Sequence, residues 1–137
     1  MIGYGTGNTL IDMKISIKRI YDSYTEGDGV RVLVDRLWPR GVRKTDAQVT
    51  LWMKEVAPSS KLRIWFGHEL ERWEVFRESY MRELDQSPEV VSRLYDLAKK
   101  DKVTLLYAAR DRYCNHARVI VEYLVQHEQR LENESML

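Results

Sequence analysis

The sequence predicts an α/β fold, a single compact domain in which a small, mostly parallel sheet carries helices packed on its faces. Residues 103–109 (VTLLYAA) are apolar almost throughout, as expected of a strand covered on both faces. Two shorter strand-like segments precede it, and segments with helical spacing of apolar residues lie between and after the strands. The strands are too few for a full Rossmann fold, and one domain accounts for the 137 residues.

The first two strands are expected early in the chain. Residues 15–20 (ISIKRI) have a strand-like apolar pattern, and residues 30–34 (VRVLV) are rich in β-branched side chains. Pro39 lacks an amide hydrogen and restricts the residue before it, so the chain must leave the sheet there.

Helical spacing of apolar residues predicts helices over residues 46–57, about 69–85 and about 115–131. Ser87 and Pro88 predict the start of another helix, because serine is a good N-cap and proline suits the first helical position. Residues 62–67 are too short a segment to assign.

The composition is that of an ordinary globular protein. Hydrophobic residues make up 44% and charged residues 31%, and 22 Lys and Arg against 21 Asp and Glu give a net charge of +1. This near-neutral total argues against a dedicated polyanion binder. No apolar run approaches the ~18 residues of a membrane span, and no secretory signal is recognisable. We therefore expect a cytoplasmic protein.

Residues 1–12 differ from the rest of the chain. They contain three of the seven glycines and have neither helical nor strand periodicity. We expect a flexible N-terminal extension over 1–12 and a single α/β domain over 13–137.

Cysteine and histidine give little evidence of chemistry. The one cysteine, Cys114, excludes an internal disulfide. It follows a strand and opens a helix, where the helix dipole lowers a thiol pKa. Arg118 follows after only three intervening residues, too close for a phosphatase-type loop to wrap an anion. The three histidines lack a paired spacing, so we expect neither a metal nor another cofactor.

Two acid–arginine pairs mark the candidate site. Asp35 and Arg36 follow one strand, and Arg110 and Asp111 follow another. Ligands of open α/β sheets bind just outside the carboxyl ends of the strands, so both pairs project into one crevice if the strands are parallel neighbours. An arginine-rich crevice suits a phosphate or carboxylate, and a helix N-terminus after residue 114 would add to it.

We assign candidate roles accordingly, with a small anion as the suspected ligand. Asp35 and His116 are the candidate acid and base residues, although the residues alone do not decide between an enzyme and a binding protein. The candidate ligand-binding residues are Arg36, Trp38, Arg40, Trp65, Arg110, Asp111 and Asn115. The alternative is architectural, because strand-end Asp and Arg residues often form ion pairs, and Asp111 could simply order the turn before the helix.

A nucleic-acid-binding protein is the second hypothesis. Residues 14–66 carry 11 Lys and Arg against six Asp and Glu, whereas residues 67–137 carry 11 against 14. Such an asymmetry produces a basic face unless the two halves interleave in the fold. A protein-interaction role ranks lower, because the predicted helix over 69–85 presents a heavily charged outer face.

The segment 30–41 (VRVLVDRLWPRG) resembles the bacterial family of domain of unknown function 488 (DUF-488), in its YeaO-like branch. Further matching segments are WMKEVAPS at 52–59, LRIWFGH at 62–68, WEVF at 73–76, TLLYAARD at 104–111 and NHA at 115–117. The resemblance covers about residues 14–126 and implies a compact α/β domain, but no established activity. Other branches have a Cys-His-Arg-like run near the last turn, from which residues 113–118 (YCNHAR) depart.

Overall fold

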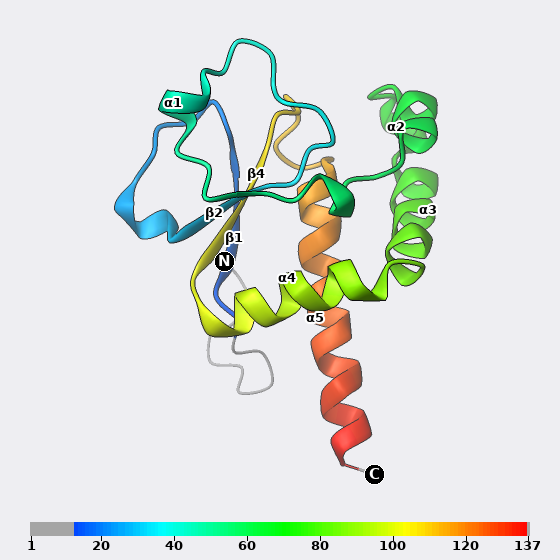
Figure 1. Cartoon of the computed structure of the whole chain (residues 1–137). Coiled ribbons are helices and arrows are strands. Elements are labelled where there is room, and N and C mark those ends of the chain that lie inside the picture. Colours follow the sequence, from blue (N-terminus) through cyan, green and yellow to red (C-terminus); the bar gives the residue numbers. More distant parts are fainter. Residues whose placement is uncertain (1–12, 137) are drawn as a thin grey trace.

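A four-stranded parallel sheet forms the centre of the protein, whose structure is a computed structural model that describes residues 13–136. The strands are β1 (Ile15–Arg19), β2 (Val30–Leu33), β3 (Leu51–Trp52) and β4 (Val103–Tyr107). They lie in the order β1-β4-β2-β3, with β4 between β1 and β2 (Figure 1). The predicted α/β class and parallel sheet are confirmed. The extension predicted over residues 1–12 lies outside the described residues.

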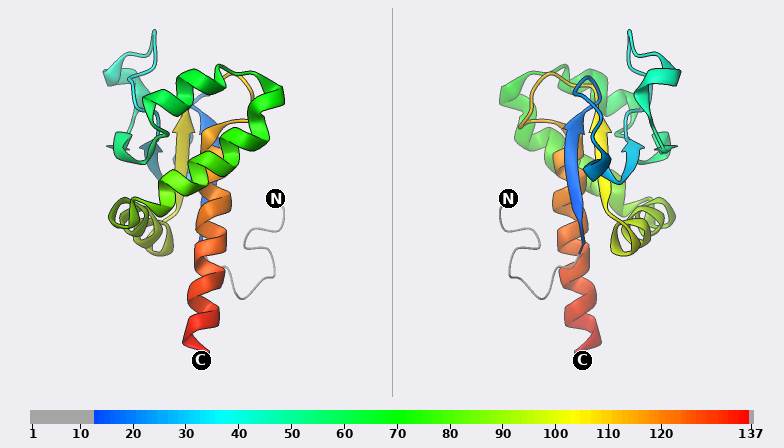
Figure 2. Two further views of the ribbon diagram at one scale, coloured as in Figure 1. Left: turned by 90° about the vertical axis from the view of Figure 1, so that its right-hand side faces the viewer. Right: turned by 90° about the vertical axis from the view of Figure 1, so that its left-hand side faces the viewer.

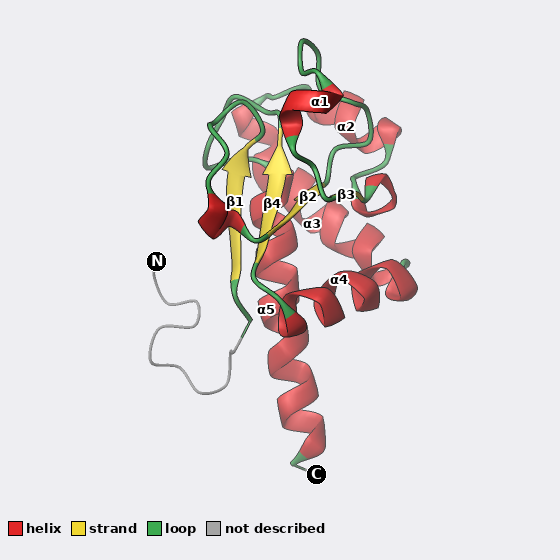
Figure 3. Cartoon of the chain, turned by 60° about the vertical axis from the view of Figure 1, so that its left-hand side comes forward, coloured by secondary structure: helices red, strands yellow, loops and turns green. Residues whose placement is uncertain are grey.

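Helices and short 3-10 turns connect the strands. The helices are α1 (Lys44–Ala47), α2 (Ser60–Phe66), α3 (Trp73–Asp85), α4 (Pro88–Lys100) and α5 (His116–Ser135), and the turns are Glu26–Asp28, Lys54–Val56 and Leu70–Arg72. Figure 3 shows α3, α4 and α5 behind the sheet, and Figure 2 shows the C-terminal part of α5 extending beyond the other elements. In residues 13–136, no helix combines the length and apolar character needed to cross a membrane.

Alternating residues of the central strand β4 face two apolar clusters. Val103, Leu105 and Tyr107 belong to the larger cluster, which also contains buried residues of α3, α4 and α5. Leu106 belongs to a smaller cluster with Leu33 of β2. The near-continuous apolar run of β4 therefore reflects burial on both faces, as predicted.

The prediction of a helix over 46–57 is wrong. Helix α1 ends at Ala47, and Gln48 adopts the left-handed region with φ 49°. The amide of Thr50 then donates to the carbonyl of Arg31 at 2.8 Å, and that of Met53 donates to the carbonyl of Leu33 at 2.9 Å. The segment thus adds β3 to the open edge of β2, where the sheet supplies the backbone hydrogen bonds that a helix would have supplied.

Two boundaries also differ from prediction. Residues 62–66 of the unassigned segment lie in α2, and Gly67 is its C-cap; the N-cap Ser59 accepts a hydrogen bond from the amide of Leu62 at 3.1 Å. The predicted helix over 69–85 begins as α3 only at Trp73, after a 3-10 turn that leaves Leu70 62% exposed. Leu70 is therefore not a core residue, whereas Tyr80 and Leu84 of the same helical segment are buried.

A buried ionic cluster lies on the side of the sheet opposite α3–α5, around Asp28. Its carboxylate contacts the Lys18 ammonium at 3.0 Å and the Arg31 guanidinium at 2.5 Å, and accepts a hydrogen bond from the Thr25 hydroxyl at 2.8 Å. Burial raises the pKa of Asp28, but the hydrogen bonds from Lys18, Thr25 and Arg31 outweigh burial and hold this pKa well below its usual range. The cluster joins β1, β2 and the turn between them.

Candidate functional site

A pocket of about 290 Å³ opens at the carboxyl ends of β2 and β4. Three segments and one α3 side chain line it: Asp35, Arg36, Leu37, Trp38 and Pro39; Ala57, Pro58, Arg63, Phe66 and His68; Ala108, Ala109, Cys114, Asn115 and His116; and Phe76. This volume lies just below the usual range for ligand sites, about 300–1,000 Å³. The pocket is where the α/β topology leads us to expect a ligand.

The two predicted acid and base residues form a pair in this pocket. His116 Nε2 lies 3.0 Å from Asp35 Oδ1 and 3.1 Å from the carbonyl oxygen of Val34. Because both oxygens are acceptors, Nε2 carries a proton, and its alignment favours the Val34 carbonyl. Among residues 13–136, no aligned donor reaches Asp35 Oδ1, so its contact with His116 is mainly electrostatic. Asp35 Oδ2 accepts from the Ala108 amide at 3.2 Å, which fixes the end of β2 against the end of β4.

Arg36 is fixed by backbone carbonyls. Its Nε donates to the Pro58 carbonyl at 3.2 Å, and its Nη2 donates to the Ala57 carbonyl at 3.1 Å. Within the described part of the chain, no carboxylate lies at ion-pair distance from this half-buried guanidinium. The side chain therefore holds the 57–58 backbone beside the pocket and keeps its positive charge uncompensated.

Trp38 is held at the pocket by two contacts. Its Nε1 donates to the carbonyl of Val42 at 2.8 Å, and its ring meets that of Trp52 edge-on, with centroids 5.4 Å apart. Both contacts are local to the loop after β2 and to β3, so the indole is a fixed part of the wall.

The turn before α5 is ordered by its own polar side chains. Buried Asn115 caps α5: its Oδ1 accepts from the Arg118 amide at 3.1 Å, and its Nδ2 donates to the Asp111 carbonyl at 3.0 Å. Hydrogen bonds from the amides of Cys114 and Tyr113 to the Asp111 carboxylate lower the pKa of Asp111. Asn115 lines the pocket. The contacts of Asp111 instead order the turn before α5, as the alternative interpretation expected.

Four predicted ligand-binding residues lie outside the pocket lining: Arg40, Trp65, Arg110 and Asp111. Trp65 is displaced because the neighbouring residues Arg63 and Phe66 occupy the pocket side of α2, while the Trp65 ring packs under the Arg72 guanidinium. Arg40 and Arg110 are exposed.

Arg63, His68 and Cys114 line the pocket but were absent from the predicted site. Burial raises the pKa of the Cys114 thiol, and the Asp111 carboxylate raises it further, contrary to the lowering expected from a helix dipole. The thiol is thus protonated at neutral pH and a weak nucleophile. Among residues 13–136, no group of three or more His, Cys, Asp or Glu side chains is placed to hold a metal ion.

His68 has an unusual backbone conformation. It follows Gly67, the left-handed C-cap of α2, and itself adopts φ 61°. A non-glycine residue in this region is strained, and such strain is concentrated at functional sites. The only signal in the sequence is Gly67 after α2, which does not reveal where the next side chain points.

Glycine should relieve this strain. We expect His68→Gly and Gln48→Gly, the latter at the other non-glycine position of positive φ, each to stabilise the protein by about 0.5–1 kcal/mol in urea unfolding. The gain at residue 68 should be the smaller of the two, because the His68 ring also packs 5.9 Å from the Phe66 ring. Destabilisation by both substitutions would refute the strain argument.

These features define an α/β protein with a pocket at the carboxyl ends of its parallel strands. The chain belongs to the family described as "Inactive DUF488-N3 subclade", whose match covers residues 14–136, and the DUF-488 resemblance is confirmed. It is 47% identical over 112 residues to "Uncharacterized protein YeaO" of Escherichia coli (strain K12), covering 82% of this chain and 97% of that protein. It is 39% identical over 113 residues to "Uncharacterized protein Rv3073c" of Mycobacterium tuberculosis, covering 82% and 95%. No solved structure matches it significantly.

Proposed function

We propose that the pocket binds a small anion bearing a phosphate or carboxylate group. The observation that carries this proposal is the pair of guanidinium groups in the pocket lining, those of Arg36 and Arg63. In residues 13–136, neither has a carboxylate at ion-pair distance. Because Arg36 is half-buried, its charge is partly desolvated without a counter-ion, and a bound anion offsets that cost.

The two arginines have different roles in this proposal. Arg36 is preorganised by its bonds to the Pro58 and Ala57 carbonyls, so its remaining nitrogen, Nη1, is held in place with little entropy left to lose. Arg63 is exposed on α2 and contacts the ligand from there. Trp38 and Asn115 also line the pocket.

We infer a binding protein rather than an enzyme. The word "inactive" in the family description supports this reading, as does the raised pKa of the Cys114 thiol. Asp35 and His116, predicted as acid and base, would then orient the ligand through the ring nitrogen of His116 that does not face Asp35.

The alternative of nucleic-acid binding by a basic N-terminal half has weaker support. Strand β1 from the N-terminal half pairs along its length with β4 from the C-terminal half, and β4 also pairs with β2. The two halves therefore interleave in the sheet, which argues against a basic face formed by the N-terminal half alone.

Titration with inorganic phosphate tests the proposal. We expect phosphate to raise the melting temperature of the wild-type protein in a concentration-dependent way at constant ionic strength, because ligand binding stabilises the folded state. Arg63→Ala should weaken phosphate binding at least about tenfold, a loss of about 1.4 kcal/mol, and change the stability of the free protein by less than about 0.5 kcal/mol.

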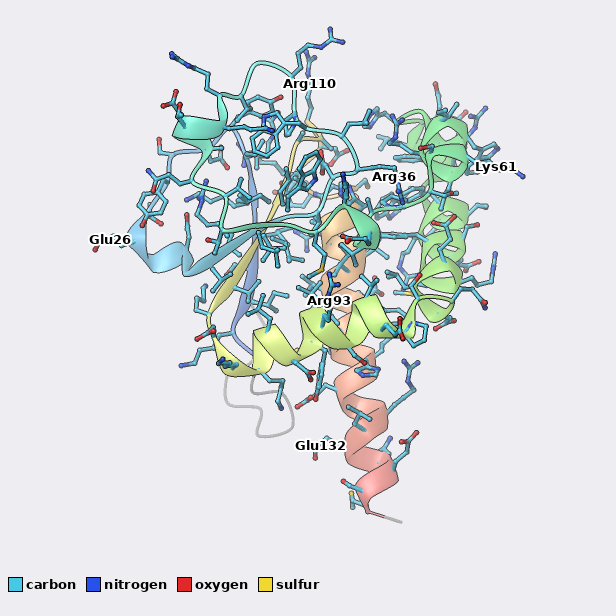
Figure 4. All side chains as sticks on the ribbon, viewed as in Figure 1. Glu26, Arg36, Lys61, Arg93, Arg110 and Glu132 are labelled. Atoms are coloured by element: carbon cyan, nitrogen blue, oxygen red, sulfur yellow. The ribbon has the colours of Figure 1, made fainter. Side chains whose placement is uncertain are left out.

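Arg93→Ala is the matched control, because Arg93 is an exposed arginine of α4 outside the pocket lining (Figure 4). It should leave phosphate binding unchanged. Equal losses in Arg63→Ala and Arg93→Ala would mean that phosphate responds to overall charge, and the pocket would not be an anion site.

A further inference from the structure

We infer that the ligand of this pocket is a nucleotide, with its base inside the pocket and its phosphates at the mouth. This inference rests on the proposed anion-binding function and specifies the class of ligand. It follows from how charge and apolar surface are distributed within and around the pocket.

The interior of the pocket is largely apolar. Phe66 and Phe76 are buried and stacked, with ring centroids 4.5 Å apart, and Trp38, Ala57 and Pro58 also line the pocket. Aromatic and small apolar side chains suit a flat ring. A volume of about 290 Å³ has room for one base and its sugar rather than for a dinucleotide.

The lining holds one carboxylate, that of Asp35, and two guanidinium groups, those of half-buried Arg36 and exposed Arg63. Asp35 and His116 lie deep, with side chains 18% and 13% exposed. Arg63 is exposed at the mouth. An anionic group seated beside Asp35 would be repelled, whereas the same group at the mouth would be attracted. The deeper part of the ligand is therefore uncharged.

The pocket also offers hydrogen-bonding atoms to the uncharged, deeper part of the ligand. Because Nε2 of His116 faces Asp35 and Val34, its Nδ1 is the ring nitrogen left to contact a ligand. The Cys114 thiol also lines the pocket. A base that carries ring nitrogens and exocyclic groups meets such partners with hydrogen bonds, which a purely aliphatic group does not.

The segments around the mouth of the pocket carry more positive charge than a ligand with a single carboxylate group would require. Residues 34–43, 57–68 and 108–115 together contain seven Lys and Arg against two Asp, while the rest of the chain contains 15 against 19. The near-neutral total thus conceals a basic end of the molecule. Figure 4 shows Arg36, Arg110 and Lys61 at this end, away from Glu26 and Glu132.

Two of these seven cations are already paired with acids outside the segments, Arg43 with Asp46 and Arg112 with Asp22. The five that remain still outnumber the two Asp residues of the segments. Arg40 and Arg110 are exposed, and in the described part of the chain neither has a carboxylate at ion-pair distance. Several cations at the mouth match a ligand with several phosphates.

A comparison of the affinities for a whole nucleotide and for its parts tests the inference. Isothermal titration of the wild-type protein would use each common ribonucleoside triphosphate, the free nucleosides, inorganic tripolyphosphate and a short single-stranded RNA. We expect at least one triphosphate to bind at least about tenfold more tightly than both its nucleoside and tripolyphosphate. The RNA arm distinguishes the source of the nucleotide: tighter binding of the RNA than of every triphosphate would identify a nucleic-acid strand, and weaker binding a free nucleotide.

Two substitutions separate base from phosphate. Ala109 lines the pocket, so Ala109→Leu places a larger side chain in the space for the base. It should weaken the binding of the nucleoside triphosphate at least about tenfold and leave the binding of tripolyphosphate unchanged. Arg110 lies outside the lining, so Arg110→Ala should weaken the binding of both triphosphate and tripolyphosphate. It should also make this binding less dependent on salt concentration. Equal affinity for the triphosphate and tripolyphosphate, or no effect of Ala109→Leu, would refute the nucleotide inference and leave the anion site standing. Failure of every anion to bind would refute the proposed function itself.

Discussion

Asparagine in place of Asp28 should destabilise the protein by about 3–5 kcal/mol, because it leaves the buried Arg31 guanidinium and the Lys18 ammonium without their common counter-ion. The same carboxylate accepts a hydrogen bond from the Thr25 hydroxyl, so the loss reaches the turn between β1 and β2 as well. Urea unfolding at pH 7 measures the effect.

The loss should depend on pH in a defined direction. The pKa of Asp28 is lower in the folded protein than the value of about 3.9 expected in the unfolded chain. Its contribution to stability is therefore complete above about pH 5 and declines as the pH falls below about 4 towards the folded-state pKa. The difference between wild type and Asp28→Asn should shrink at pH 3.

Asp46→Asn is the control for this substitution. The Asp46 carboxylate lies 3.9 Å from the Arg43 guanidinium, but both side chains are largely exposed, so the change should cost less than about 0.5 kcal/mol. A loss at Asp28 no larger than that at Asp46, or one that persists undiminished at pH 3, would contradict the role given to the buried cluster.

Alanine in place of Arg36 should affect stability and binding together. The substitution removes two hydrogen bonds to the carbonyls of Pro58 and Ala57, which should lower the free energy of unfolding by about 2 kcal/mol. It also removes the preorganised cation of the pocket, so affinity for inorganic phosphate should fall at least about tenfold. The carbonyl partners of Arg36 are not evident from the sequence.

Arg40→Ala provides the comparison, because Arg40 lies four residues away on the same loop but outside the lining and exposed. The stability of Arg40→Ala should change by less than about 0.5 kcal/mol, and its affinity for inorganic phosphate should fall less than that of Arg36→Ala. An Arg36→Ala protein that keeps wild-type stability would show that the carbonyl contacts contribute nothing.

The sequence predicted elements whose signals are local. The apolar run of β4 identified a strand buried on two faces, and Ser87 with Pro88 marked the start of α4. The same approach failed at residues 46–57, where Trp52 contacts the smaller apolar cluster and Met53 and Val56 contact the larger one. These apolar side chains contact different clusters, but their spacing along the sequence happens to match that of one face of a helix.

The candidate site was predictable only in part, for a related reason. The ends of β2 and β4 are visible in the sequence, so Asp35, Arg36 and His116 were found where topology brings them together. The approach of α2 to these strand ends depends on tertiary packing, through Phe66 stacked on Phe76. Without that packing, sequence reasoning chose Trp65 instead of Arg63 and omitted His68.

Chemical-shift mapping of the backbone amides during a phosphate titration tests most directly whether the pocket is the anion site. We predict saturable shifts confined to the three lining segments, with the largest changes at Arg36, Arg63 and His68. Amides around Asp28 and Arg93 should not move. Saturable shifts centred away from the pocket, or small non-saturating shifts spread over all exposed cations, would contradict the account.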